Sequence, residues 1–281
     1  MSELTDLEKR HYIRIISENK NIDRLSELKS KIPQKFYRYR SLLNEYEIEN
    51  MMHKQIWLSR PTEFNDPYDS MINIDTEELL KECLEMDKEI ISVYEKLDRK
   101  SKRKTQRFVE KEKKELQKKI NIEWEKQRKL FGIACFSEIY DSLLMWSHYA
   151  DYHKGICLEY DFKELLNKAM FCPVIYTGRF ENISKCIDLK NDMVSNRVIE
   201  LILSKAKDWS YENEWRMLDT LSESGKENGK LLKGLKPLKI LLGCRIEDNN
   251  ERKIIKVANK LHIPVKKMRM DTKKFRVYVE E

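Results

Sequence analysis

The sequence predicts an α+β protein: a body built on a mixed, mainly antiparallel, split sheet, with a long helical hairpin inserted into it. Runs typical of strands recur along the chain, but the regular crossover helices of a doubly wound sheet do not separate them. Only 7 Gly and 6 Pro occur in 281 residues, too few for an all-β protein with many tight turns. The segment 75–130 contains neither residue type and has apolar residues at helical spacing.

Three parts are expected along the chain. They are an N-terminal helical segment (1–32), the α+β body (33–74 and 131–281) and the helical-hairpin insertion (75–130). In the first part, apolar residues at helical spacing predict an amphipathic helix within 4–30, and Pro33 ends it.

The body is expected to begin with a strand at 36–40, where aromatic and basic residues alternate. The segment 64–69 is expected to be a turn, because Pro67 restricts the residue before it and fits neither a helix nor a central strand. Further strands are expected at 56–59, 132–137, 155–160, 174–176, within 209–218, and at 238–242, 265–270 and 275–279; helices are expected at 43–54, 142–150, 188–206 and 251–261.

The insertion is expected to form two long antiparallel helices. Apolar residues recur at helical spacing from Leu79 to Tyr94, and the pattern resumes from Phe108 to Trp124 after a polar stretch at 98–107. Residues 99–129 contain 14 Lys or Arg and 5 Glu, a net charge of +9 in a chain whose net charge is +7. Two interpretations stay open: a solvated helix face, or a surface that grips nucleic acid or another polyanion.

The composition favours a cytoplasmic protein without a membrane span. The first 16 residues contain no apolar core of a signal peptide, and no stretch approaches the ~18 apolar residues of a spanning helix. The 6 cysteines are scattered without a C-x-x-C pair, so we expect reduced thiols and no metal site. Motifs of P-loop, Rossmann, serine-hydrolase and zinc-protease sites do not occur.

Two polar groups lie in the first part of the body. Alternation in the strand at 36–40 places Arg38 and Arg40 on one face and Tyr39 on the other, and two guanidiniums on one face suit a phosphate or carboxylate. An ordinary salt-bridged face is the alternative. The turn offers Asn65, Asp66 and Asp69, which either orient a ligand or a metal ion or cap the turn itself.

A third group follows the strand at 132–137. Ser137 ends that strand, and His148 and Tyr149 lie on the helix that comes next. His148 and Asp151 are three residues apart and can share a helical face as an acid–base pair, although a lone helical histidine is often structural.

The fourth group is the most suggestive. Glu212, Glu214 and Arg216 alternate, so a strand would place all three side chains on one face. Neighbouring carboxylates repel when both are ionised, and an arginine beside them offsets that repulsion. The group is therefore either a structural salt-bridge ladder or a carboxylate site that binds a ribose hydroxyl or stabilises a cationic transition state.

Several of these blocks together resemble a bacterial family of unknown function, DUF2971. The blocks are F-Y-R-Y-R at 36–40, W-L-S at 57–59 with F-N-D-P-Y-D at 64–69, A-C-F-S-E at 134–138, M-W-S-H-Y-A at 145–150 with Gly155, and E-N-E-W-R at 212–216. They occur in the expected order over residues 35 to about 279. The resemblance implies no settled activity.

The order of the blocks is also similar, more weakly, to that of the ADP-ribosyltransferase superfamily. This resemblance implies that Arg38 or Arg40 contacts the phosphates or ribose of NAD and that Ser137 supports the nicotinamide side. Glu214 would hold the ribose hydroxyl and stabilise an oxocarbenium-like state, and Glu212 would activate the acceptor. Tyr39, His148 and Tyr149 are further candidates for contacts with NAD; the family's usual S-T-S strand reads F-S-E here.

Three hypotheses of function follow. The first is an NAD-dependent ADP-ribosyltransferase-like effector, in a toxin or phage-defence setting, with a protein or nucleic-acid acceptor. The second is a nucleic-acid-binding or nucleic-acid-processing protein that uses the basic segment 99–129. The third is a non-catalytic interaction protein that docks through the helical hairpin.

Overall fold

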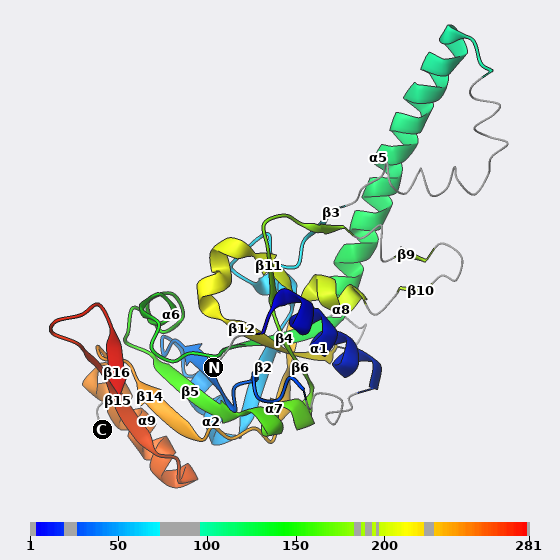
Figure 1. The fold of residues 1–281 in the computed structure, drawn as a ribbon. Coiled ribbons are helices and arrows are strands. Elements are labelled where there is room, and N and C mark those ends of the chain that lie inside the picture. Colours follow the sequence, from blue (N-terminus) through cyan, green and yellow to red (C-terminus); the bar gives the residue numbers. More distant parts are fainter. Residues whose placement is uncertain are drawn as a thin grey trace.

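A computed structural model describes residues 4–19, 27–73, 96–182, 187–188, 193–194, 197–221 and 228–279. Its centre is a 10-stranded mixed sheet, in which the β14–β15 pair is parallel and the other pairs are antiparallel (Figure 1). The predicted α+β class is therefore confirmed. The strands lie in the order β13 (Gly229–Lys233), β2 (Gln55–Ser59), β4 (Phe131–Ser137), β1 (Lys35–Arg40), β5 (Ile156–Asp161), β14 (Lys239–Leu242), β15 (Val265–Met270) and β16 (Val277–Val279), while β12 (Glu214–Thr220) joins β4 to β6 (Met170–Pro173).

The sheet divides at β4. One edge of β4 pairs along its whole length with β12, from Glu214–Ser137 to Thr220–Phe131. Its other edge pairs with β1 at Tyr37–Ser137 and with β2 at Ser59–Ile133. Strands β1 and β2 therefore leave the same edge of β4 in a fork, and this fork is the split that the predicted fold class contains.

A tight aromatic cluster fills one side of the sheet. The rings of Phe36 and Trp215 lie 4.9 Å apart, and those of Phe136 and Phe171 lie 5.4 Å apart. Helix α1 (Asp6–Asn19) covers the cluster, and the buried Tyr12 hydroxyl donates to the Phe171 carbonyl at 2.9 Å. Helix α1 therefore packs into the same hydrophobic core as the sheet.

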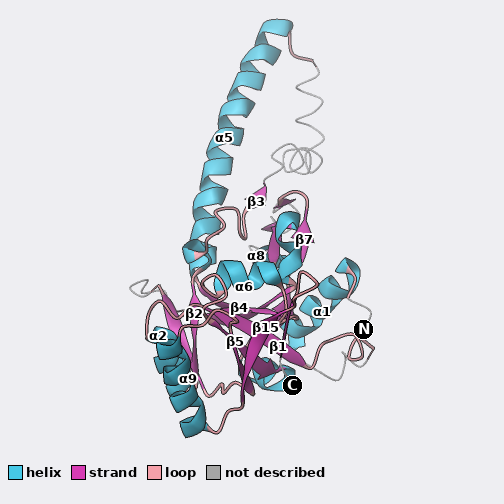
Figure 2. Cartoon of the chain, turned by 90° about the vertical axis from the view of Figure 1, so that its left-hand side faces the viewer, coloured by secondary structure: helices cyan, strands magenta, loops and turns pink. Residues whose placement is uncertain are grey.

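Other helices complete the two faces. On the opposite side of β1, helix α6 (Leu143–Tyr149) packs over Tyr37 and Tyr39, and the Tyr39 and Trp146 rings meet edge to face at 5.3 Å. Helices α2 (Tyr46–Met52) and α9 (Asp248–Leu261) lie beside each other, at the lower left of Figure 2. Helix α7 (Phe162–Lys168), which the sequence patterns missed, joins β5 to β6.

Helix α5 (Arg99–Lys129) extends away from the sheet in both views (Figures 1 and 2). It begins at Asp98, whose side chain accepts from the backbone N–H groups of Lys100 and Ser101. The polar stretch 98–107 is therefore not a break between two helices, because a capped helix runs through it. The expected first helix of the hairpin falls mostly on 74–95, outside the described residues.

The prediction of one continuous helix at 188–206 is wrong. Its described part contains the short strand β10 (Met193–Val194), helix α8 (Arg197–Ile202) and strand β11 (Ser204–Ala206). Strand β11 pairs in parallel with β7 (Ile175–Thr177), so sheet pairing overrides the helical spacing of the apolar residues.

Other differences concern short elements. The helix expected within 4–30 is described as α1, which ends at Asn19, and the helix at 43–54 shortens to α2. Strands β6 and β13 were not predicted. Strands β3 (Ile72–Asn73) and β8 (Glu181–Asn182) form a small parallel pair, and β9 (Ile187–Asp188) pairs with β10. Among the described residues, no helix combines the length and apolar character that crossing a bilayer requires.

Gly155→Ala is expected to lower the free energy of unfolding by about 2–3 kcal/mol. A Cβ at Gly155 would lie 2.2 Å from the carbonyl oxygen of Arg40 and 3.0 Å from backbone atoms of Ala150, so the start of β5 would have to move. Urea unfolding midpoints measure the effect. Gly178→Ala is the matched control, because a Cβ there meets nothing within 4 Å, and equal midpoints for the two variants would contradict this packing.

Candidate functional site

A cavity of about 370 Å³ lies at the fork of the sheet. This volume falls in the range of small-molecule sites in proteins. Its lining comes from β1, β4, the turn after β2, helix α6, β11 and the start of β12. The lining includes the predicted site residues Arg38, Tyr39, Arg40, Asn65, Asp69, Ser137, His148, Tyr149, Glu212 and Glu214.

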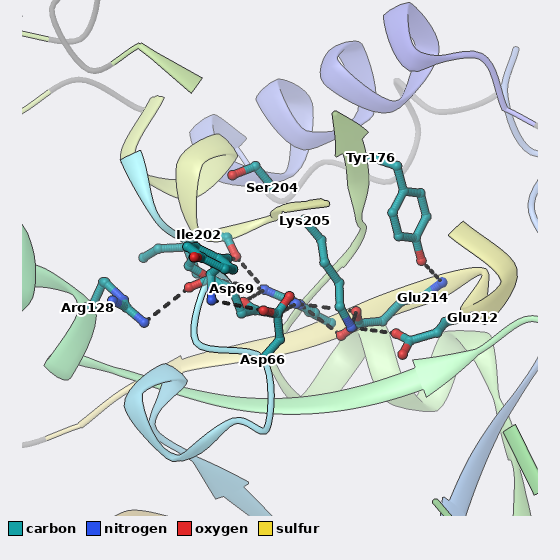
Figure 3. A network of polar contacts seen from close by, with 12 residues as sticks. Asp66, Asp69, Arg128, Tyr176, Ile202, Ser204, Lys205, Glu212 and Glu214 are labelled. Carbon is teal, nitrogen blue, oxygen red and sulfur yellow. Dashed lines mark hydrogen bonds and ion pairs between the residues drawn. The ribbon is translucent and has the colours of Figure 1, made fainter. Parts of the chain in front are cut away.

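The floor of the site is a buried ion network centred on Arg216 (Figure 3). The Arg216 guanidinium donates to both carboxylate oxygens of Asp69, at 2.9 and 2.5 Å, and from Nε to Glu214 at 2.9 Å. It also donates to the Ile202 carbonyl at 2.7 Å. Its side chain is fully buried, and these contacts join β12 to the turn after β2 and to the end of α8.

Lys205 extends the network toward the cavity. Its ammonium donates to Glu212 at 2.5 Å and to Glu214 at 2.9 Å (Figure 3). The Tyr149 hydroxyl donates to the other oxygen of Glu212 at 2.5 Å, and the Tyr176 hydroxyl accepts from the Glu214 backbone N–H at 2.8 Å. Through Tyr149, helix α6 is therefore hydrogen-bonded to Glu212.

The two glutamates have opposite electrostatics. Burial raises the pKa of Glu212, and the charge of Glu214 raises it further against the opposing effect of Lys205. Burial alone would also raise the pKa of Glu214, but Arg216 and Lys205 outweigh it and hold that pKa well below its usual value. Glu214 is therefore the carboxylate whose ionised form is stabilised, and Glu212 takes up a proton more readily.

The opposite end of the cavity is basic. The Arg38 side chain crosses the fork and donates to the carbonyl of Trp57 in β2 at 3.1 Å, over the ring of Phe136. Arg40 donates to the buried carboxylate of Glu47 at 2.7 Å and keeps 38% of its side chain exposed. The arginines do share a face, as alternation predicted, but Arg40 is the more available for a ligand.

The charges at the two ends of the cavity differ in sign. With all three carboxylates (Asp69, Glu212 and Glu214) ionised, two cations (Lys205 and Arg216) leave one negative charge at the floor. Arg38 and Arg40 lie beside one buried carboxylate (Glu47), which leaves one positive charge in that group, and Glu63 is a further carboxylate of the lining. The cavity thus offers both cationic and anionic side chains to a ligand.

Other predicted residues have structural partners. The Ser137 hydroxyl donates to the Glu212 carbonyl at 2.6 Å, and the Tyr39 hydroxyl donates to the Ile139 carbonyl at 2.9 Å. His148 Nδ1 shares a hydrogen bond of 3.0 Å with the Tyr211 hydroxyl. The expected His148–Asp151 pair on one helical face is wrong, because α6 ends at Tyr149 and Asp151 has a left-handed backbone with φ 46°.

The turn at 64–69 is capped by one of its own side chains, which was one of the two interpretations of it. Asp66 accepts from the Tyr68 backbone N–H at 2.9 Å, which closes the turn, and Asn65 lies beside Tyr149 in the cavity wall. Asp69 holds Arg216 and thereby orients Glu214. Among the described residues, no group of three or more His, Cys, Asp and Glu is placed to hold a metal ion.

Sequence patterns misplaced one residue and missed another. Glu212 ends a 3-10 helix (Lys207–Glu212), and the left-handed Asn213 (φ 44°) separates it from β12, so Glu212 does not belong to the strand ladder that alternation predicted. It joins Glu214 because both bind Lys205. Nothing in the sequence marks Lys205, which is one of 55 basic residues and lies in the segment predicted as a helix.

Comparison with known families finds a match in the middle of this site. Residues 145–217 match the family described as Protein of unknown function (DUF2971), which confirms the expected resemblance over that segment. The segment runs from α6 into β12 and contains Tyr149, Lys205, Glu212, Glu214 and Arg216. Neither the curated proteins nor the solved structures contain a match to this chain.

Glu212→Gln and Glu214→Gln are expected to change the pH dependence of stability in opposite ways. The pKa of Glu212 is raised from 4.5, so the wild type loses stability relative to Glu212→Gln as pH rises from 4.5 through the folded-state pKa. The loss is about 1.4 kcal/mol for each unit of increase. The pKa of Glu214 is lowered from 4.5, so the wild type loses stability relative to Glu214→Gln as pH falls below 4.5.

Urea unfolding of the three proteins across this pH range measures both differences. Glu164→Gln makes the same chemical change on the exposed surface of α7 and controls for the substitution itself. If the stability of the wild type relative to each variant changed with pH in the same direction for Glu212→Gln and Glu214→Gln, the assignment of a raised pKa to Glu212 and a lowered pKa to Glu214 would be contradicted.

Proposed function

We propose that this protein is an NAD-dependent ADP-ribosyltransferase-like enzyme that binds NAD in the cavity at the fork. The observation that carries the proposal is the opposite charge at the two ends of one cavity. NAD has the same division, because its pyrophosphate is anionic and its nicotinamide ring is cationic. The basic end with Arg40 suits the pyrophosphate, and the acidic floor suits the ring.

In this proposal the two glutamates have different tasks. The bond between the nicotinamide nitrogen and C1′ of the ribose breaks, and nicotinamide leaves with the bonding electron pair. The cationic ribose that develops is stabilised by the charge of Glu214, which Arg216 and Lys205 keep ionised. An acceptor nucleophile then bonds to C1′ and gives its proton to Glu212, whose raised pKa suits a base.

NAD at 100 times its dissociation constant is expected to stabilise the protein by about 2.7 kcal/mol, visible as a higher melting temperature. The wild type is expected to release nicotinamide, and Glu214→Gln is expected to release it about 10²-fold more slowly, because the cationic state loses a charge partner. Thermal unfolding with and without NAD, together with chromatographic detection of nicotinamide, measures both.

Glu164→Gln, on the surface of α7, is the control and is expected to match the wild type in both assays. Glu212→Gln separates the two steps, since it is expected to impair transfer to an acceptor more than the binding of NAD. A wild type that neither shifts in melting temperature nor releases nicotinamide would overturn the proposal and leave the network as a structural element of the fold.

A further inference from the structure

Helix α5 is anchored to the body at its C-terminal end. The Trp124 indole N–H donates to the Ser70 carbonyl at 3.0 Å. Arg128 donates to the Asp69 carbonyl at 3.1 Å, and Figure 3 shows this second contact. Trp124 and Arg128 are both buried, whereas the helix farther out extends away from the sheet (Figure 1). The outer helix is therefore held on a fixed root and does not contribute to the aromatic core.

One face of the outer helix is a continuous row of cations, which we name the basic stripe. It consists of Lys100, Lys104, Arg107, Lys111, Lys114 and Lys118. The intervals of four and three residues keep these side chains on one side of a helix, and all six are exposed. At 1.5 Å per residue the stripe is about 27 Å long.

The opposite face of the helix differs. Its members Lys102, Thr105, Val109, Lys113 and Ile120 are partly buried. The stripe therefore lies on the more exposed side of the helix.

The stripe carries more positive charge than a solvated helix face usually does. Along such faces, charges of both signs commonly alternate. Here the glutamates Glu110, Glu112 and Glu115 lie to either side of the stripe by helical geometry, and Glu115 reaches its last member, Lys118, at 3.0 Å. The excess positive charge requires a polyanion or counterions to balance it.

The side chains favour nucleic acid over a membrane as that polyanion. A helix that lies on a membrane needs a row of apolar side chains next to its cations. Phe108, Leu116 and Ile122 are exposed, but Phe108 lies beside the stripe, Leu116 on the opposite side of the helix and Ile122 beyond the end of the stripe, so they form no such row. A row of cations about 27 Å long can face several phosphates, because the charges of a nucleic acid strand repeat every 3.4 Å along the duplex axis.

We propose that the basic stripe of α5 binds the phosphate backbone of nucleic acid without sequence preference. The proposal is independent of NAD chemistry, so either can fail while the other stands. Binding of a fluorescent 20-base-pair DNA duplex to the full chain, followed by anisotropy, provides the test. If about six phosphates are contacted, the logarithm of the association constant falls with the logarithm of salt concentration with a slope of about −5.

Two matched triple variants locate the binding. Lys104→Glu, Arg107→Glu and Lys111→Glu reverse half of the stripe, whereas Arg252→Glu, Lys256→Glu and Lys260→Glu reverse three exposed cations at helical spacing on α9. Both triples replace one Arg and two Lys, so the change in net charge is the same. The α5 triple is expected to reduce the salt slope by about 3 and to weaken binding by about 10²-fold or more at low salt. The α9 triple is expected to weaken it much less.

Circular dichroism and urea midpoints establish that both triples remain folded. A single-stranded RNA of equal length forms a second arm, and its binding relative to the duplex tells which kind of backbone the stripe prefers. The proposal is overturned if both triples weaken binding equally, if binding ignores salt, or if the protein binds vesicles containing phosphatidylserine and neither nucleic acid.

Discussion

The bond between Arg216 and its two carboxylates is the interaction on which the rest of the site depends. A fully buried guanidinium is tolerated when its charge is paired and its N–H groups find acceptors, and Asp69, Glu214 and the Ile202 carbonyl supply both. These acceptors come from three separate segments of the chain. The chain must therefore bring the turn after β2, the end of α8 and the start of β12 together before the charge can be buried.

The same turn joins the site to the long helix. The Asp69 carboxylate pairs with Arg216, and the Asp69 carbonyl accepts a hydrogen bond from Arg128. The neighbouring Ser70 carbonyl accepts from Trp124. Two neighbouring residues thus fix both the floor of the cavity and the root of α5. Because these contacts are buried hydrogen bonds, a movement at the root of the helix has a direct path of contacts to Glu214.

The fork in the sheet provides the space for chemistry. Strands β1 and β2 diverge where they leave β4, and this leaves an opening between them. The Arg38 side chain crosses the opening and donates to the Trp57 carbonyl. The resulting cavity is lined by both cations and carboxylates, and the interactions among its buried charges are stronger than they would be in water. Arg216 and Lys205 hold the pKa of Glu214 low, whereas burial and the charge of Glu214 raise the pKa of Glu212, and acid–base chemistry needs such a separation.

The sequence by itself determined the α+β class, most strands, the turn at Pro67 and the polar blocks that line the cavity, because alternation, glycine and proline content and local polar clusters are properties of neighbouring residues. It also marked Glu212, Glu214 and Arg216 as a group, although it placed Glu212 in the strand. Only the tertiary structure decided that Asp69 pairs with Arg216 across 147 positions and that Lys205 binds both glutamates. The helix predicted at 188–206 failed for the same reason: pairing with β7 and burial of Lys205 among carboxylates are long-range interactions, which local spacing does not encode.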